Sequence, residues 1–506
     1  MATETLENAP EAYEELLDRY ERIAYIGSAA GVLGWDQRVT MPDGGTPARA
    51  RQQSALSGLR HELLTDEELG ELLTACEGAD LTSAQQAAVR EIRREYDRSA
   101  RVPQDLVERM SQKSSEAVEI WEEAKAEDDF EQFAPHLEEL VELNRQYAEH
   151  IDPDRDPYEV LFEGYEPYLP LETAERVLTR LREELPPLID GIRASDTELA
   201  RPFEGLEYPV EAQEAFSRAV LDDLGYDWDH GRLDTSSHPF TSGNPYDTRI
   251  TTRYDESDPL GGLMATIHEF GHAYYGLGIP REEFGSPLGS AMGLTIHESQ
   301  SRLWENQIGR SGAFWHYLAP LIREHFDGLD DVTPQALYEA ASRVYENNMI
   351  RVEADELTYH MHIVLRFEIE RDLIRGDLDV GEVPAVWNEK MVEYLGIRPE
   401  TDTEGCLQDI HWSQGSFGYF PTYSLGSVLA AQLDHHARTA IDELDDEVRN
   451  GEFGALREWL RQNIHEHGAR YTTPELIELA TGEEFTADYF LDHVESKYAA
   501  LYDLDR

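Results

Sequence analysis

Cysteine is nearly absent from this sequence of 506 residues, in which only Cys76 and Cys406 occur. Two cysteines are too few for a disulfide framework or for a metal site built from thiolates. Any metal ion would therefore need histidine and carboxylate ligands. The chain is long enough to bury a large core, so core size sets no limit on its folding.

Long apolar runs are also missing. The sequence contains no stretch of eighteen or more apolar residues, which predicts that no segment spans a membrane. The first ten residues lack the basic region and apolar stretch of a secretory signal. We therefore expect a cytoplasmic protein.

Basic residues are scarce, and lysine most of all. The chain has 103 Asp plus Glu against 43 Lys plus Arg, and only four of these 43 are lysines. The formal net charge of −60 would repel nucleic acid and anionic membranes. At molar salt the Debye length falls to about 3 Å, which screens the repulsion between carboxylates. The composition thus predicts a halophilic protein, with an acidic surface that binds basic proteins as the alternative.

Helical periodicity runs through most of the chain. Apolar residues recur at three- and four-residue spacing and acidic residues fill the opposite face, which predicts an all-α body. The predicted helices cover residues 12–33, 48–64, 83–98, 107–150, 171–192, 210–224, 260–278, 293–309, 334–345, 383–394, 426–449 and 486–502.

Three short segments, 231–234, 248–254 and 289–295, are bounded by Gly, Pro and Asp instead. They predict a small β-sheet near a cleft. Internal repeats and long linkers are not visible in the sequence, so no firm domain boundary follows. We expect one helical unit over 1–506, with an N-terminal helical lobe (1–200) and a catalytic lobe (201–506).

Within 260–278, His268 and His272 are four residues apart and share one face of the predicted helix. Two imidazoles at this separation can bind one tetrahedral zinc ion, and Glu269 can act on a bound water as general base. This H-E-x-x-H pattern predicts a zincin-like metallopeptidase. With 18 histidines in the chain, it would arise by chance in roughly one chain in fifteen, so it is not decisive alone.

A catalytic zinc ion needs a third protein ligand and one open position for water. Glu298 is the best candidate, because it lies 26 residues after His272 on the predicted helix 293–309. Its neighbour His297 is the second candidate, although a packed or hydrogen-bonded histidine is favoured there. The alternative for Glu298 is one more solvated acid in an acid-rich chain.

Five blocks of the sequence, spread over most of its length, resemble a known family in the family's own order. They are LGWDQ at 33–37 with MP at 41–42, DTRIT at 247–251, HEFGH at 268–272 with HES at 297–299, IRVEAD at 350–355, and GCLQDIHW at 405–412. With these blocks the chain resembles the thermostable carboxypeptidase Taq family of metallocarboxypeptidases.

The resemblance implies several properties. Members of that family are nearly all helical, form homodimers, hold one divalent metal ion in a deep cleft, and remove C-terminal residues from peptides with broad specificity. It implies His268, His272 and Glu298 as the ligands of one Zn²⁺ and Glu269 as the base. Co²⁺ and Mn²⁺ are candidate substitutes for zinc.

The resemblance further implies roles for residues outside the metal motif. Arg351 would receive the terminal carboxylate of the substrate, with Arg249 as a second candidate. His411 and Tyr423 would stabilise the tetrahedral intermediate, with Tyr419 as an alternative that would also contact substrate. Each of these tyrosines has a simpler interpretation as a side chain that only packs against the core.

Chemistry agrees with these roles. Arginine offers a bidentate fork for a carboxylate, and imidazole and phenol groups are suitable donors to an oxyanion. The simpler interpretation of Arg351 is an ion pair with Glu353 or Asp355. Asp409 would orient His411 or a zinc-bound histidine, or be an ordinary surface acid.

Two other functions compete with a carboxypeptidase. One is an endo-acting oligopeptidase or dipeptidase with the same zinc site. The other is an inactive helical protein that binds peptides or proteins, which the retention of both histidines and both glutamates disfavours.

Overall fold

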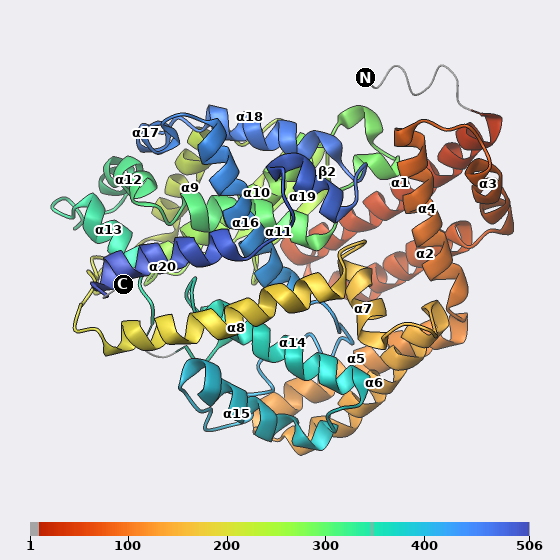
Figure 1. Ribbon diagram of the computed structural model, residues 1–506, viewed down its shortest axis with the longest axis horizontal. Coiled ribbons are helices and arrows are strands. Elements are labelled where there is room, and N and C mark those ends of the chain that lie inside the picture. Colours follow the sequence, from red (N-terminus) through yellow and green to blue (C-terminus); the bar gives the residue numbers. More distant parts are fainter. Residues whose placement is uncertain (1–9, 346–347, 505–506) are drawn as a thin grey trace.

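The computed structural model describes residues 10–345 and 348–504. Helices make up most of the molecule, and a single three-stranded sheet lies among them in this part of the chain (Figure 1). The prediction of an all-α fold with a small sheet is therefore confirmed. Across these same residues, every helix is too short or too polar to cross a membrane.

The first four helices form a group with an apolar core of its own. They are α1 (Glu11–Val39), α2 (Thr46–Leu64), α3 (Glu67–Glu77) and α4 (Ser83–Arg101), drawn in red and orange in Figure 1. Leu16 and Ile23 of α1 pack with Leu73 of α3 and Ile92 of α4. Leu288, which is distant in sequence from these helices, also belongs to this small core. It connects the four-helix group to the segment that precedes Glu298, the candidate third metal ligand.

The segment predicted as one helix over 107–150 is two helices, α5 (Gln104–Glu127) and α6 (Phe130–Ile151). Asp128 adopts a left-handed backbone conformation with φ of 58°, which ends α5. Asp129 then accepts a hydrogen bond from the backbone N–H of Gln132 and caps α6. Short polar side chains tolerate this conformation, and apolar periodicity alone does not reveal it.

The remaining helices build the main core. They are α7 (Pro157–Tyr165), α8 (Leu171–Ala194), α9 (Val210–Leu224), α10 (Pro259–Gly278), α11 (Leu294–Arg302), α12 (Gly312–His325), α13 (Pro334–Ala341), α14 (Tyr359–Arg375), α15 (Val383–Leu395), α16 (Pro421–Ala440), α17 (Leu444–Arg449), α18 (Gly454–Asn463), α19 (Thr473–Thr481) and α20 (Asp488–Tyr502).

Helix α16 lies at the centre of this core. It contacts α8, α11, α14 and α20, and it is apolar on several sides, as expected for a fully enclosed helix. The prediction of one helix over 426–449 is wrong, because Glu443 has a left-handed conformation between α16 and α17. The main core runs from Val102 to Tyr502 and so includes residues on both sides of position 200. The division into lobes at that position stays a prediction.

The sheet consists of β1 (Leu233–Thr235), β2 (Thr241–Asn244) and β3 (Asp247–Thr252) in the order β1-β3-β2. Strand β3 pairs in parallel with β1 and in antiparallel with β2. Segments 231–234 and 248–254 therefore correspond to strands, whereas 289–295 does not, because α11 begins at Leu294. The sequence of β2, TSGN, lacks the alternation of apolar residues that would have predicted it.

Helices α10 and α11 meet at a distance that only glycine permits. A Cβ atom on Gly271 of α10 would lie 2.5 Å from the carbonyl oxygen of Gln300. On the other side of α11, a Cβ atom on Gly426 of α16 would lie 2.4 Å from Cγ of Glu298. Helix α11 is thus clamped between α10 and α16.

We expect Gly271→Ala to lower the free energy of unfolding by about 1–3 kcal/mol, because the added methyl group must push α11 away from α10. Denaturant unfolding measures this change. Gly58→Ala is the matched control, since its Cβ would meet open space within α2, and alanine there should be neutral or stabilising by up to about 1 kcal/mol. Equal stability of the two variants would contradict the clamp.

Candidate metal centre

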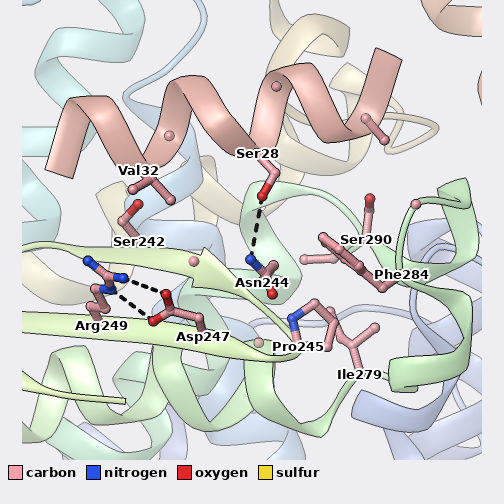
Figure 2. A pocket seen from close by; sticks show the side chains of 18 of the residues that line it. Ser28, Val32, Ser242, Asn244, Pro245, Asp247, Arg249, Ile279, Phe284 and Ser290 are labelled. Carbon is pink, nitrogen blue, oxygen red and sulfur yellow. Dashed lines mark hydrogen bonds and ion pairs between the residues drawn. The ribbon is translucent and has the colours of Figure 1, made fainter. Parts of the chain in front are cut away.

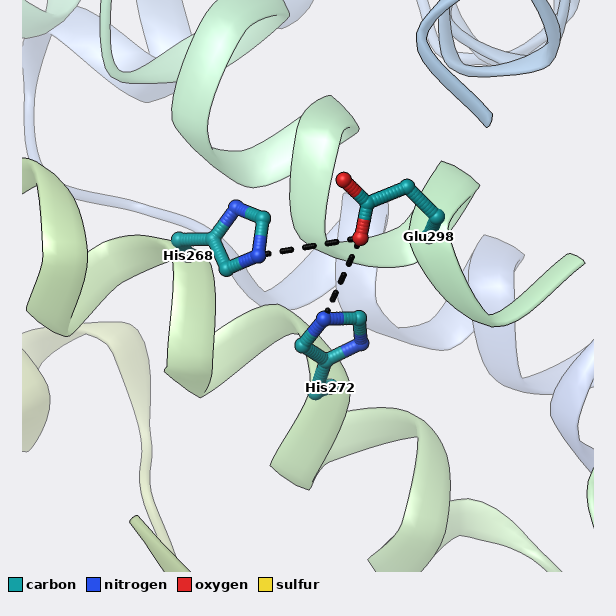
Figure 3. A group of neighbouring side chains, drawn as sticks. All are labelled: His268, His272 and Glu298. Atoms are coloured by element: carbon teal, nitrogen blue, oxygen red, sulfur yellow. Dashed lines mark ion pairs between the residues drawn. The ribbon is translucent and has the colours of Figure 1, made fainter. Parts of the chain in front are cut away.

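Three side chains predicted as metal ligands converge at the contact of α10 and α11 (Figure 3). His268 and His272 project from one face of α10, and Glu298 faces them from α11. Glu298 Oε2 lies 3.7 Å from His268 Nε2 and 3.3 Å from His272 Nε2. Donor atoms of the three residues all lie within 4.8 Å of one another, close enough to share one ion.

The opposite nitrogen of each imidazole is occupied by another side chain. His268 Nδ1 lies 2.9 Å from Glu305 Oε2, and His272 Nδ1 lies 2.6 Å from His297 Nδ1. A carboxylate can only accept, so His268 carries a hydrogen on Nδ1 and turns Nε2 toward Glu298. The hydrogen bond of His297 agrees with the interpretation that the sequence favoured for it.

Glu298 is held by further partners on its own helix. Arg302 Nε donates to Glu298 Oε1 at 2.7 Å, and Ser301 Oγ donates to Oε2 at 3.0 Å. Burial by itself would raise the pKa of Glu298, but Arg302 and the two histidines hold it well below its usual value. The carboxylate is therefore ionised, with Oε1 tied to arginine and Oε2 directed at the imidazoles.

Glu305 links the same arginine to His268. Its Oε2 accepts from Arg302 Nη1 at 3.1 Å, and its Oε1 lies 3.4 Å from Arg310 Nη2. Burial opposes ionisation of Glu305, yet Arg302 and His268 lower its pKa to about 2. Sequence reasoning missed Glu305 and Arg302. Arg302 lies four residues after Glu298 and Glu305 lies seven residues after it, and this spacing was the available signal for a shared helix face.

Glu269 lies beside the ligands and is almost buried, with 6% of its surface exposed. Thr241 Oγ1 of β2 donates to Glu269 Oε2 at 2.6 Å, so the sheet fixes the direction of this carboxylate. A cavity of about 310 Å³ is lined by the three candidate ligands, Glu269 and Thr241, together with Tyr419, Tyr423 and neighbouring side chains. Nothing in the sequence around Thr241 predicted its contact with Glu269.

Tyr423 lines this cavity, and His411, which is not a lining residue, lies next to it. Tyr423 OH lies 3.5 Å from His411 Nε2. Burial lowers the pKa of His411 to about 4, and burial also raises the pKa of Tyr423 well above its usual value. The ring of Tyr419 packs against both, with centroids 5.6 Å from His411 and 5.2 Å from Tyr423. The three residues thus form one aromatic cluster, and two of them, Tyr419 and Tyr423, line the cavity.

Arg351 lies beside that cluster, with its guanidinium 5.5 Å from the ring centroid of Tyr423. Its Nε donates to Asp409 Oδ1 at 2.9 Å. The alternative pairing of Arg351 with Glu353 or Asp355 is wrong, because Asp409 is the acid it contacts. Asp355 instead accepts hydrogen bonds from the backbone at the start of α14 and from Tyr345.

Arg249 lies apart from the other predicted residues, in a second cavity of about 360 Å³ between α1 and the β2–β3 hairpin (Figure 2). Its guanidinium forms two hydrogen bonds with Asp247, at 2.8 and 2.6 Å, and lies over the ring of Trp35. Ser28 of α1 faces Asn244 across the same cavity. His297 lines both cavities and separates Arg249 from the histidines of α10.

Comparison with known proteins shows similarity over nearly the whole chain. The thermostable carboxypeptidase 1 of Thermus thermophilus is 41% identical over 97% of this chain and 99% of that protein. The protein of the same name from Pyrococcus furiosus is 38% identical over 96% of this chain and 98% of that protein. Carboxypeptidase 1 of Bacillus subtilis is 36% identical, over 97% and 98%.

Solved structures agree with the sequences. The M32 carboxypeptidase from Deinococcus radiodurans R1 superposes with a TM-score of 0.94 at 37% identity, covering 98% of this chain and 100% of that one. Trypanosoma cruzi metallocarboxypeptidase 1 gives a TM-score of 0.93 at 37% identity, covering 96% and 99%. Residues 15–498 also match the family model described as carboxypeptidase Taq (M32) metallopeptidase. The chain therefore belongs to the carboxypeptidase Taq (M32) family of metallopeptidases.

Proposed function

We propose that this chain hydrolyses the C-terminal peptide bond of peptides with broad specificity, as a zinc-dependent carboxypeptidase. The observation that carries the proposal is the convergence of His268, His272 and Glu298 in one cavity with Glu269 beside them. Membership of a metallopeptidase family whose relatives are named carboxypeptidases supports the direction of cleavage.

The donor set fits a catalytic zinc ion. Two imidazole nitrogens and one carboxylate oxygen are typical ligands of such ions, and they leave a coordination position open. His268 would bind through Nε2 because its Nδ1 is engaged by Glu305, and Glu298 would bind through Oε2 because Oε1 is paired with Arg302. Co²⁺ and Mn²⁺ remain candidate substitutes, since both accept the same ligands.

Glu269 is the proposed general base. A zinc ion bound here supplies a Lewis acid that polarises the scissile carbonyl and lowers the pKa of a water molecule. Glu269 takes the proton from the attacking water on its carboxylate and then delivers it to the nitrogen of the leaving amino acid. The hydrogen bond from Thr241 keeps the Glu269 carboxylate directed into the cavity during both transfers.

His411 and Tyr423 are the proposed donors to the oxyanion. The raised pKa of Tyr423 keeps its hydroxyl protonated, so the hydroxyl can donate a hydrogen bond. His411, with its pKa near 4, is a neutral imidazole at pH 7 and can donate from one nitrogen. Tyr419 lies against both rings and is the alternative donor and a contact for the substrate.

Arg351 is the proposed receptor for the substrate's terminal carboxylate. The net charge of −60 disfavours an anionic substrate at long range, so a local cation is required to seat its end. Arg351 lies directly behind Tyr423, a residue of the cavity wall. Arg249 is the weaker candidate, because it lines the second cavity and not the one that holds Glu269 and the candidate metal ligands.

We also propose that the protein is a homodimer, on the strength of the family resemblance. Its composition supports a cytoplasmic, salt-adapted protein that does not bind nucleic acid or membranes.

Replacement of the base tests the mechanism. Glu269→Gln should retain one zinc ion per chain and lose turnover by at least about a hundredfold, because the amide cannot accept the proton. Steady-state kinetics and metal analysis measure the two effects separately. Glu324→Gln, an exposed site on α12, is the matched control and should keep full activity. An active Glu269→Gln enzyme would remove this assignment.

The free C-terminus of the substrate tests the direction of cleavage. Mass spectrometry of mixed peptides, incubated with zinc-loaded enzyme in high salt, should reveal ladders shortened from the C-terminus. Amidation of that terminus should slow cleavage by about tenfold or more, because Arg351 loses an ionic partner. Equal cleavage of amidated peptides at internal bonds would favour the endo-acting alternative. Intact peptides, together with a metal-free protein, would favour the inactive binding protein.

A further inference from the structure

A buried ionic cluster lies behind the proposed carboxylate receptor. Asp409 is shared between two arginines, with Oδ1 2.8 Å from Arg351 Nη2 and Oδ2 2.6 Å from Arg366 Nε. Gln408 joins the same two residues, because its Oε1 accepts from the backbone N–H of Arg351 at 3.1 Å and from Arg366 Nη2 at 3.0 Å. One loop thus positions both guanidinium groups.

The two arginines differ in their access to ligands. Arg366 is completely buried on α14, where Nη1 donates to the carbonyl oxygen of His362 at 2.9 Å and the guanidinium lies 4.5 Å from the ring centroid of Trp387. Arg351 retains 8% exposure, and Asp409 and Tyr359 engage three of its five N–H donors. Of the two, Arg351 is the one with some exposed surface and unengaged N–H donors, so Arg366 can act on a substrate only through it.

The charges around Asp409 do not cancel. His362 and His411 are neutral, because burial lowers the pKa of the first to about 3 and of the second to about 4. Glu370, which also faces Arg366, has its pKa raised by burial to about 8 and is mostly protonated at pH 7. Two guanidinium groups thus share one carboxylate.

Lys125, which donates to the carbonyl oxygen of Gln408, adds further positive charge from the outer side of the cluster. An excess of buried positive charge is unfavourable unless an anion compensates it. In a chain with a net charge of −60, such an excess is unusual and indicates a site that accepts an anionic group.

We propose that Arg366 is a positioning residue for substrate binding, which neutralises Asp409 so that Arg351 keeps a full positive charge for the terminal carboxylate. This inference rests on the proposed role of Arg351. Without Arg366, Asp409 would still orient Arg351 but would cancel its charge, and an incoming carboxylate would meet a neutral pair. Because Arg366 compensates the charge of Asp409, Asp409 can orient the guanidinium of Arg351 without cancelling its positive charge.

Equilibrium binding separates this electrostatic role from a structural one. Zinc-loaded Glu269→Gln protein serves as the parent, so that peptide binds without being cleaved. The probes are N-acetyl-alanyl-alanine and its C-terminal amide, and calorimetry in one high-salt buffer gives both Kd values. The readout is the ratio of the amide Kd to the carboxylate Kd, which a general loss of packing would leave unchanged.

Arg366→Met should lower this ratio by about tenfold or more through weaker binding of the carboxylate alone, because a buried charge interaction is poorly screened by salt. Arg371→Met, at a half-buried ion pair on the same helix, is the matched control and should keep the parental ratio. The double variant Arg366→Met/Asp409→Asn should recover most of the ratio, since Arg351 regains its uncancelled charge.

A double variant that binds the carboxylate as weakly as Arg366→Met, or more weakly, would overturn the proposal. If Arg366→Met does not fold, Asp409→Asn alone decides the question. It should keep the parental ratio or raise it, and a lower ratio would contradict the role of charge. A parent that binds the acid and the amide equally would instead refute carboxylate recognition by Arg351, which is a failure of the proposed function.

Discussion

The candidate metal site and the proposed chemistry depend on the hydrogen bonds and ion pairs that hold Glu298 against two imidazoles. Those three donor groups come from two helices, and their outer atoms are all engaged, by Glu305 on one ring, by His297 on the other and by Arg302 on the carboxylate. These contacts leave Nε2 of each ring facing Oε2 of Glu298, and those three atoms are the donors available to a divalent cation. Gly271 of α10 and Gly426 of α16 face α11 from two sides and let the helix backbones come close enough for these contacts. The packing of α11 therefore determines the geometry of the candidate metal site.

The chain as a whole is strongly acidic, whereas arginine side chains lie around the candidate site. The sequence has 103 acidic residues, and the arginines around the candidate site are buried or half-buried. Arg302 and Arg310 compensate the acids around the metal ligands, whereas Arg351 and Arg366 exceed the single acid they share. Arginine suits both tasks because its planar fork satisfies several acceptors at once and it stays charged when buried. Arginine therefore compensates the acids around the candidate metal ligands, and it leaves an excess positive charge at Asp409 that can bind an anion.

The two histidines could be predicted from spacing, the roles of Arg351, His411 and Tyr423 came only from the family resemblance, and the rest of the site depends on tertiary contacts. The four-residue interval between His268 and His272 fixes their common face once the segment is helical. Thr241 was not predictable, because its contact with Glu269 depends on how a four-residue strand packs on α10. Arg366 lies in α14, which none of the predicted helices covered, and only burial and the loop carrying Asp409 give it a distinct role. In the fold, helix periodicity succeeded where apolar spacing continued. It failed at left-handed turns, which depend on single backbone angles.

Anomalous diffraction from zinc-loaded crystals, collected on both sides of the zinc absorption edge, tests the central claim most directly. We predict one peak per chain, bounded by Nε2 of His268, Nε2 of His272 and Oε2 of Glu298 at about 2.0–2.2 Å. A peak held by other residues, or Glu298 turned away from an ion bound to the two histidines, would contradict the claim.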